Sequence, residues 1–185
     1  MTDQKFELNQ TNRVLPLVMI AIGVAAVATG FMSDPTRAWA SLLISNFYFN
    51  AIALAGLFFV AVQMIAQSGW SSGLIRVPEA MSGFLKFGMA GMILIFVLGH
   101  HDLYHWTHAE LYDKASPEYD PILDGKHGFL NLTFYSIRLI AYTLIWVGFA
   151  WMIRKKSLEE DEVGGVEPYR RKMVLSAVFV VLFAV

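Results

Sequence analysis

The residues that could do chemistry are concentrated in one short stretch of the sequence, GHHDLYHWTHAELYDK. It holds His100, His101, His105 and His108 beside Asp102, and it directly follows the apolar run FGMAGMILIFVL. If a helix over this run continues outward, His101, His105 and His108 are spaced i, i+4 and i+7 and share one face. Such a stripe could bind a metal or ligate a haem. It could also relay protons, since imidazole titrates near neutral pH and an adjacent carboxylate can orient the ring.

Metal or haem ligation is the weaker pair of interpretations. An intramembrane haem is generally clamped between histidines on different helices, and the only other histidine, His127, lies just before an apolar run rather than within one. Two interpretations therefore lead: proton or quinol handling, and a wetted interfacial cluster without a ligand role.

The composition points to a membrane protein. Hydrophobic residues make up 56 % of the 185 residues and charged residues only 16 %, against about a quarter charged in soluble domains. The net charge of −1 gives no reason to expect nucleic-acid binding. Cysteine is absent, which excludes disulfides, iron–sulfur clusters and thioether-attached haem within this chain. A redox centre would have to sit on a partner or be held by histidine.

Five apolar runs predict the elements that position the histidines. A span needs roughly 20 apolar residues, and the runs are Val14–Met32, Leu42–Gln67, Met81–Leu98, Phe129–Ile153 and Met173–Val185. A signal peptide is the rival interpretation of the first run, which is longer than a typical signal core. The last run reaches only about 20 Å, so we expect a chain that continues beyond it. The predicted fold is an all-α polytopic transmembrane helix bundle, with four full spans and the start of a fifth.

Basic residues predict the orientation. Ten Lys and Arg flank one side of the predicted spans and three flank the other, and basic loops stay in the cytoplasm. We therefore expect a multi-pass protein with a cytoplasmic N-terminus. The predicted parts are a cytoplasmic segment 1–13, a bundle 14–153 with an outward loop 100–128, a cytoplasmic loop 154–172 and a fifth helix starting at 173.

Three polar features lie within or beside the predicted spans. Arg138 is nine residues along the fourth run, and a central cation costs at least about 2.5 kcal/mol, so it should snorkel or find a carboxylate, a helix carboxyl end or a quinone headgroup. Asn46 and Asn50 are one turn apart and could bridge helices by hydrogen bonds. The polar start of the fourth run, around Asn131 and Tyr135, could line a wet vestibule together with the histidines.

Several separated motifs resemble one family. The segments LGHHDLYHWTH, NFYFNAIALAGLFFVAVQ, GWSSGLIRVPEA and DPILDGKHGFLNLTFYSIRLIAYTLIWVGFAW, the last with the spacing K-x-x-x-L-N-x-x-F-x-x-x-R, occur between about residues 40 and 160. Together they resemble the NrfD-like integral membrane subunits of bacterial alternative complex III. The closest likeness is to the F subunit, the second quinone-binding-type subunit of this quinol:cytochrome c oxidoreductase.

This resemblance implies a longer chain of about ten spans in the bacterial inner membrane. It implies no cofactor in this chain, a quinol (menaquinol or ubiquinol) as electron donor, and possible proton translocation. The implied partners are an iron–sulfur protein, multihaem cytochromes c and a sister NrfD-like subunit, which is the stronger candidate for the quinol pocket. The residues carried over to a quinol or proton path are His100, His101, Asp102, His105, His108, Lys126 and Arg138.

Two other functions stay open at this point. A secondary transporter would use Arg138 and the Asn and Gln positions as a substrate route. A structural scaffold would use the outward connection of residues 100–128 to dock extramembrane subunits. In none of these readings do we expect the chain to have enzymatic activity alone.

Overall fold

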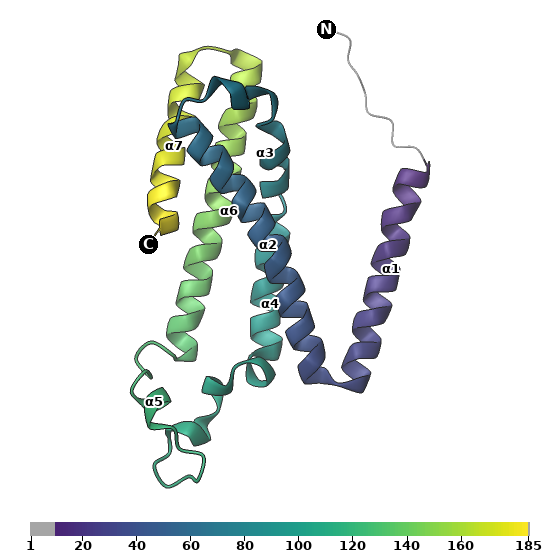
Figure 1. The fold of residues 1–185 in the computed structure, drawn as a ribbon, viewed down its shortest axis with the longest axis vertical. Helices are drawn as coiled ribbons and strands as arrows, with labels where there is room; N and C mark the ends of the chain where they lie inside the picture. The colour runs from purple at the N-terminus through teal and green to yellow at the C-terminus, as the bar shows by residue number, and fades with distance from the viewer. Residues whose placement is uncertain (1–9, 185) are drawn as a thin grey trace.

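The structure is a computed structural model and describes residues 10–184. That part of the chain is helical and contains no β-strand. The α-helices are α1 (Gln10–Ser33), α2 (Pro35–Ile65), α3 (Arg76–Ser82), α4 (Leu85–Leu103), α5 (Pro121–Asp124), α6 (Leu132–Val163) and α7 (Val166–Ala184). Figure 1 shows a long bundle of α2, α4, α6 and α7, with α1 standing apart. The predicted all-α bundle is confirmed.

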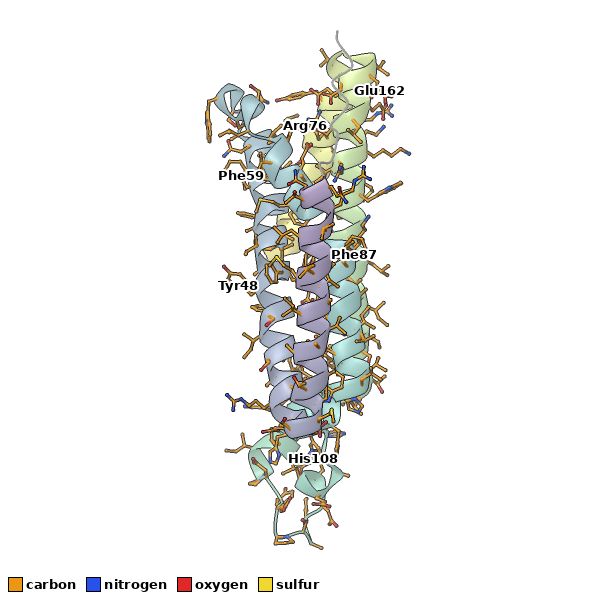
Figure 2. All side chains as sticks on the ribbon, turned by 90° about the vertical axis from the view of Figure 1, so that its right-hand side faces the viewer. Tyr48, Phe59, Arg76, Phe87, His108 and Glu162 are labelled. Atoms are coloured by element: carbon orange, nitrogen blue, oxygen red, sulfur yellow. The ribbon has the colours of Figure 1, made fainter. Side chains whose placement is uncertain are left out.

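Four segments are long and apolar enough to cross a membrane: α1, α2, α6, and α3 with α4 as one unit from Arg76 to Leu103. Their large apolar side chains point outward along the length of the bundle (Figure 2). Leu17, Ile44, Phe87 and Leu144 are each between 65 % and 69 % exposed. A soluble monomer rarely leaves so much contiguous apolar surface uncovered, and hydrocarbon is the solvent that suits it.

The connections alternate between two ends of the bundle (Figure 1). The α1–α2 turn and the loop of residues 104–131 lie at one end, which we call the histidine end. The α2–α3 connection and the α6–α7 turn lie at the other, which we call the basic end. This is the alternation that the apolar runs predict.

The predicted loop over residues 154–172 is wrong. α6 continues to Val163 and α7 begins at Val166, so only Gly164 and Gly165 connect them. Both glycines have positive φ, 67° and 88°, which lets the chain reverse within two residues. The charged segment before them stays helical, helped by side-chain pairs one turn apart such as Lys156 with Glu159, an arrangement that supports helix.

α2 and α4 pack antiparallel at very short range because α4 presents glycines to large α2 side chains. A Cβ added to Gly88 would lie 2.2 Å from Asn50 Oδ1, and one added to Gly99 would lie 2.7 Å from the Trp39 ring. Asn46 Nδ2 donates a hydrogen bond of 2.9 Å to the Gly88 carbonyl. The predicted bridge between helices is confirmed for Asn46.

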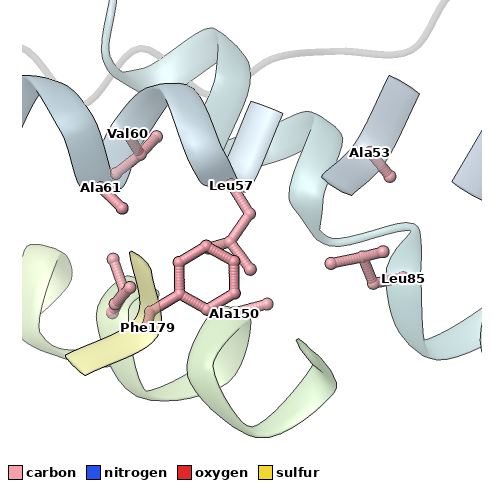
Figure 3. Close-up of a cluster of buried hydrophobic side chains, with 8 residues drawn as sticks. Ala53, Leu57, Val60, Ala61, Leu85, Ala150 and Phe179 are labelled. Atoms are coloured by element: carbon pink, nitrogen blue, oxygen red, sulfur yellow. The ribbon is translucent and has the colours of Figure 1, made fainter. Parts of the chain in front are cut away.

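The apolar core lies toward the basic end, where four helices meet. Phe179 of α7 is fully buried against Leu57 of α2 and Ile153 of α6, and Leu85 of α4 joins them. Figure 3 shows the Phe179 ring beside Leu57 and Ala150. α7 is therefore held by its own buried ring, while α1 has no buried residue.

A cluster of ions closes the basic end. The Arg76 guanidinium donates to Glu79 at 2.7 Å and to Ser157 Oγ at 2.9 Å, and it also pairs with Asp161. Lys172, which is 5 % exposed, pairs with Glu160 at 2.5 Å. These contacts tie α3 and α7 to the last turns of α6. Because α6 spans about 48 Å and a hydrocarbon core about 30 Å, we place this cluster beyond the apolar layer.

We predict that Gly88→Ala lowers the free energy of unfolding in detergent by about 1–3 kcal/mol, because the new methyl group displaces Asn50 from α4. SDS titration followed by tryptophan fluorescence measures this. Gly148→Ala on α6 is the matched control, since a Cβ there meets nothing within 4 Å. Equal stability of the two variants would contradict the close approach of α2 and α4.

Candidate functional site

The histidine end is shaped by where α4 stops. The helix ends at Leu103, and Tyr104 takes an extended conformation with φ −117° and ψ 98°. A short 3₁₀ turn, His105–Thr107, follows, and Thr107 Oγ1 donates to the Tyr104 carbonyl at 2.8 Å. The condition under which His101, His105 and His108 would share one helix face, a helix that continues past Leu103, is therefore not met.

The reversal of the chain nevertheless brings these three imidazoles together. The His101 and His108 rings lie 4.3 Å apart between centres and 30° from parallel. The His105 ring lies 5.4 Å from that of His108, edge on. We call these three residues the imidazole cluster. His108 marks its place at the end of the bundle in Figure 2.

Hydrogen bonds to carbonyl groups define where two histidines carry their protons. His108 Nε2 lies 3.0 Å from the His101 carbonyl, and His100 Nδ1 lies 3.0 Å from the Phe96 carbonyl. A carbonyl oxygen only accepts, so each of these nitrogens is the protonated one in the neutral ring. The lone pairs of His108 Nδ1 and His100 Nε2 are then the positions that can receive a further proton.

Asp102 does not join the cluster. Its side chain is exposed, and within residues 10–184 it forms neither a hydrogen bond nor an ion pair with a histidine. The His–Asp pairing that the sequence suggested is therefore absent from the described residues.

A layer of aromatic rings lies beside the imidazole cluster. Tyr104 Oη and Tyr135 Oη are 3.3 Å apart, and the Tyr135 ring also lies 4.6 Å from Phe96 and 5.6 Å from Trp106. Burial, and then the hydrogen bond with Tyr135, raises the pKa of the Tyr104 phenol well above its usual value. The phenol is thus a hydrogen-bond donor at neutral pH and not a proton carrier.

The loop of residues 104–131 folds over this layer. Tyr112 Oη donates to the Trp106 carbonyl at 2.8 Å, and the Tyr112 ring meets His127 edge on at 4.6 Å. A cavity of about 330 Å³ between the loop and the start of α6 is lined by these three residues and Asn131. The structure thus places a recess between the histidine loop and the start of α6, where the sequence suggested a wet vestibule.

Arg138 and Lys126 lie apart from the imidazoles. Arg138 reaches back toward the histidine end, where its Nη2 donates to the Phe129 carbonyl at 3.3 Å and its Cζ lies 3.7 Å from the Phe129 ring centre. No carboxylate pairs with Arg138 in the described chain. Aromatic faces and one carbonyl therefore surround the guanidinium where a carboxylate was one of the expected partners, and its buried Nη1 has no hydrogen-bond partner within the described residues. Lys126 is exposed on the loop.

Sequence reasoning missed the contact between Tyr104 and Tyr135 and the ion cluster of the basic end. The phenols are 31 residues apart in the chain, and no local spacing indicates such a pair. Arg76 and Glu79 are one turn apart, which is a signal that could have been used. Within residues 10–184 no group of three or more His, Asp or Glu side chains is arranged to hold a metal ion.

No protein-family model matches this chain, and no curated protein matches it.

We predict that Tyr104→Phe leaves the rise in tyrosinate absorbance of the folded protein unchanged up to about pH 11, because the Tyr104 phenol stays protonated while ordinary tyrosines ionise near pH 10. Ultraviolet titration in lipid nanodiscs measures this. The chain has 7 tyrosines. The same variant in denaturant should lose one seventh of the amplitude, and the same loss in the folded protein would contradict the burial of Tyr104.

Proposed function

We propose that this chain is an integral membrane subunit of a respiratory quinol:electron-acceptor oxidoreductase complex of the alternative complex III type, in the bacterial inner membrane. The imidazole cluster at the end of α4 is the observation that best supports it. Three rings within 5.4 Å of a neighbour, at the end of an apolar bundle, suit the acceptance of protons. The motifs that resemble the NrfD-like subunits include this same stretch.

Proton acceptance follows from the tautomers. Quinol oxidation gives up two electrons and two protons, and His108 Nδ1 and His100 Nε2 hold the lone pairs that can receive protons. Iron–sulfur clusters and haem c on partner subunits would supply the electron acceptors. The His101 and His108 rings are 4.3 Å apart between centres, which places two imidazoles side by side on one proposed proton path.

The second part of the proposed role is to hold the imidazoles in place on the outer side of the membrane. The rings of Tyr104, Tyr135, Phe96 and Trp106 pack on one another, and the Phe96 ring lies 5.6 Å from that of His100. By the positive-inside rule the basic end is cytoplasmic, so the imidazole cluster faces the periplasm. Released protons would then leave on the outer side.

A scaffold role is the second candidate, and one observation favours it. Many polar groups of the histidine end are used within the fold. Asn131 caps α6 by accepting from the Phe134 amide at 2.8 Å, and Asp120 caps α5 in the same way. A loop stabilised like this is a firm docking platform for an extramembrane subunit.

Affinity purification from native membranes tests membership of the complex. We expect the tagged chain to bring down c-type haem and non-haem iron, although it has no cysteine of its own. A chain that is recovered without either would point to a transporter.

We predict that the double variant His101→Phe with His108→Phe lowers quinol:acceptor turnover by about tenfold or more, because phenylalanine keeps a flat aromatic ring at each position but lacks the nitrogens that accept protons. Turnover is measured in membranes with equal content of the complex. His127→Phe is the control, since its ring lies outside the imidazole cluster. Normal turnover of the double variant would reduce the cluster to an interfacial anchor and leave the scaffold role.

A further inference from the structure

A groove opens between α4 and α6 on the flank of the basic end. Its volume is about 720 Å³. Three cations line it, Lys86 from α4 and Arg154 and Lys155 from α6. Its apolar lining comes from four side chains on one stretch of α6, namely Val147, Ala150, Trp151 and Leu158. The groove therefore has a cationic part and an apolar part along the same wall.

The three cations have no ionic partner of their own. Within residues 10–184, Lys86, Arg154 and Lys155 take part in no ion pair, whereas the other cations facing the core of this end do. Lys86 and Lys155 rest only on the aromatic rings beside them, at 4.8 Å and 5.1 Å. The positive charge of the groove is thus available to an anion.

Two carboxylates also line the groove, toward the α6–α7 turn. They are Glu159 and Glu162. Glu159 is already neutralised by Lys156 at 2.5 Å. Glu162 forms no ion pair within the described residues, so the three unpaired cations still exceed the one unpaired carboxylate of the lining. Arg154 and Lys155 precede Glu162 on α6, so this excess of positive charge lies nearer the apolar spans than Glu162 does.

The Arg154 side chain extends from α6 to the opposite wall of the groove. A Cβ placed on Gly83 would lie 3.1 Å from Arg154 Nη1. The guanidinium therefore crosses the groove from α6 and rests against the junction between α3 and α4. A side chain at Gly83 would require the guanidinium to shift by a few tenths of an ångström.

The depth of the groove matches a lipid headgroup. Lys86 lies about 26 Å along α4 from Leu103, and Arg154 lies about 33 Å along α6 from Leu132, at 1.5 Å per residue. A hydrocarbon core is about 30 Å thick. If the histidine end marks one boundary of the apolar layer, these cations mark the other boundary. Trp151 then lies at the membrane–water interface, where tryptophan side chains are enriched.

We propose that this groove binds an anionic phospholipid of the leaflet at the basic end. Arg154 donates to the phosphate in the paired geometry that guanidinium favours, and Lys86 and Lys155 add point charges. The acyl chains run down the apolar lining of α6 toward the histidine end. The proposal depends on the membrane embedding of the chain and not on quinol, so it stands or falls separately from the proposed function.

Native mass spectrometry of the purified protein tests it, with phosphatidylglycerol and phosphatidylcholine of identical acyl chains as probes. We expect a first phosphatidylglycerol adduct that binds at least tenfold more tightly than phosphatidylcholine. The variant Lys86→Gln with Arg154→Gln should lose this preference. Its melting temperature in detergent is measured in parallel, so that loss of the lipid is not confused with loss of the fold.

The matched control removes the same charge from the neighbouring groove between α6 and α7. Arg170 and Arg171 line that groove, and Arg170→Gln with Arg171→Gln should retain the first adduct. If both variants bind the first phosphatidylglycerol equally weakly, general surface charge attracts the lipid and the proposed site is wrong. Displacement of the lipid by inorganic phosphate alone would likewise overturn it in favour of a free-anion site.

Discussion

The close approach of α2 and α4 is the constraint on which the rest of the structure depends. Hydrocarbon offers no hydrophobic drive to bring apolar helices together, so short-range packing and hydrogen bonds between helices must hold them. Glycines on α4 supply the room, and Asn46 and Trp39 on α2 fill it. Because Trp39 packs on Gly99, the last residue before the histidines, the same contact sets the position at which the imidazole cluster leaves the bundle.

The two ends of the bundle use polar groups in opposite ways. At the basic end, carboxylates pair with Arg76 and Lys172 and tie α3 and α7 to α6. At the histidine end, imidazoles bond to backbone carbonyls and keep a free nitrogen. The first arrangement satisfies charge and stabilises the fold, whereas the second leaves groups able to take up a proton. This contrast is why our proposal assigns proton acceptance to the histidine end.

Most of the fold could be predicted from the sequence because apolar run length reports directly on spans. The same reasoning failed for the charged segment after residue 154, which was predicted to be a loop. This segment is helical, and the pair of Lys156 with Glu159 stabilises the last turns of α6. Sequence reasoning also failed at Tyr104, whose extended conformation ends α4. No periodicity in the sequence predicts this end. The pairing of Tyr104 with Tyr135 depends on how α4 and α6 pack, and local spacing carries no information about that.

Helix length explains why the charged and the apolar parts of the basic end can coexist. α6 is about 18 Å longer than a hydrocarbon core, so its last turns emerge from the apolar layer and can carry Ser157 and Asp161 against Arg76. Buried ions are tolerable there because each is paired and water is near. At the boundary expected from these lengths, α6 carries the exposed side chains of Trp151 and Arg154, and the second reaches toward Gly83. Lys86, Arg154 and Lys155 lie near that boundary, where we propose that a lipid phosphate takes the place of the carboxylates that pair with cations farther out.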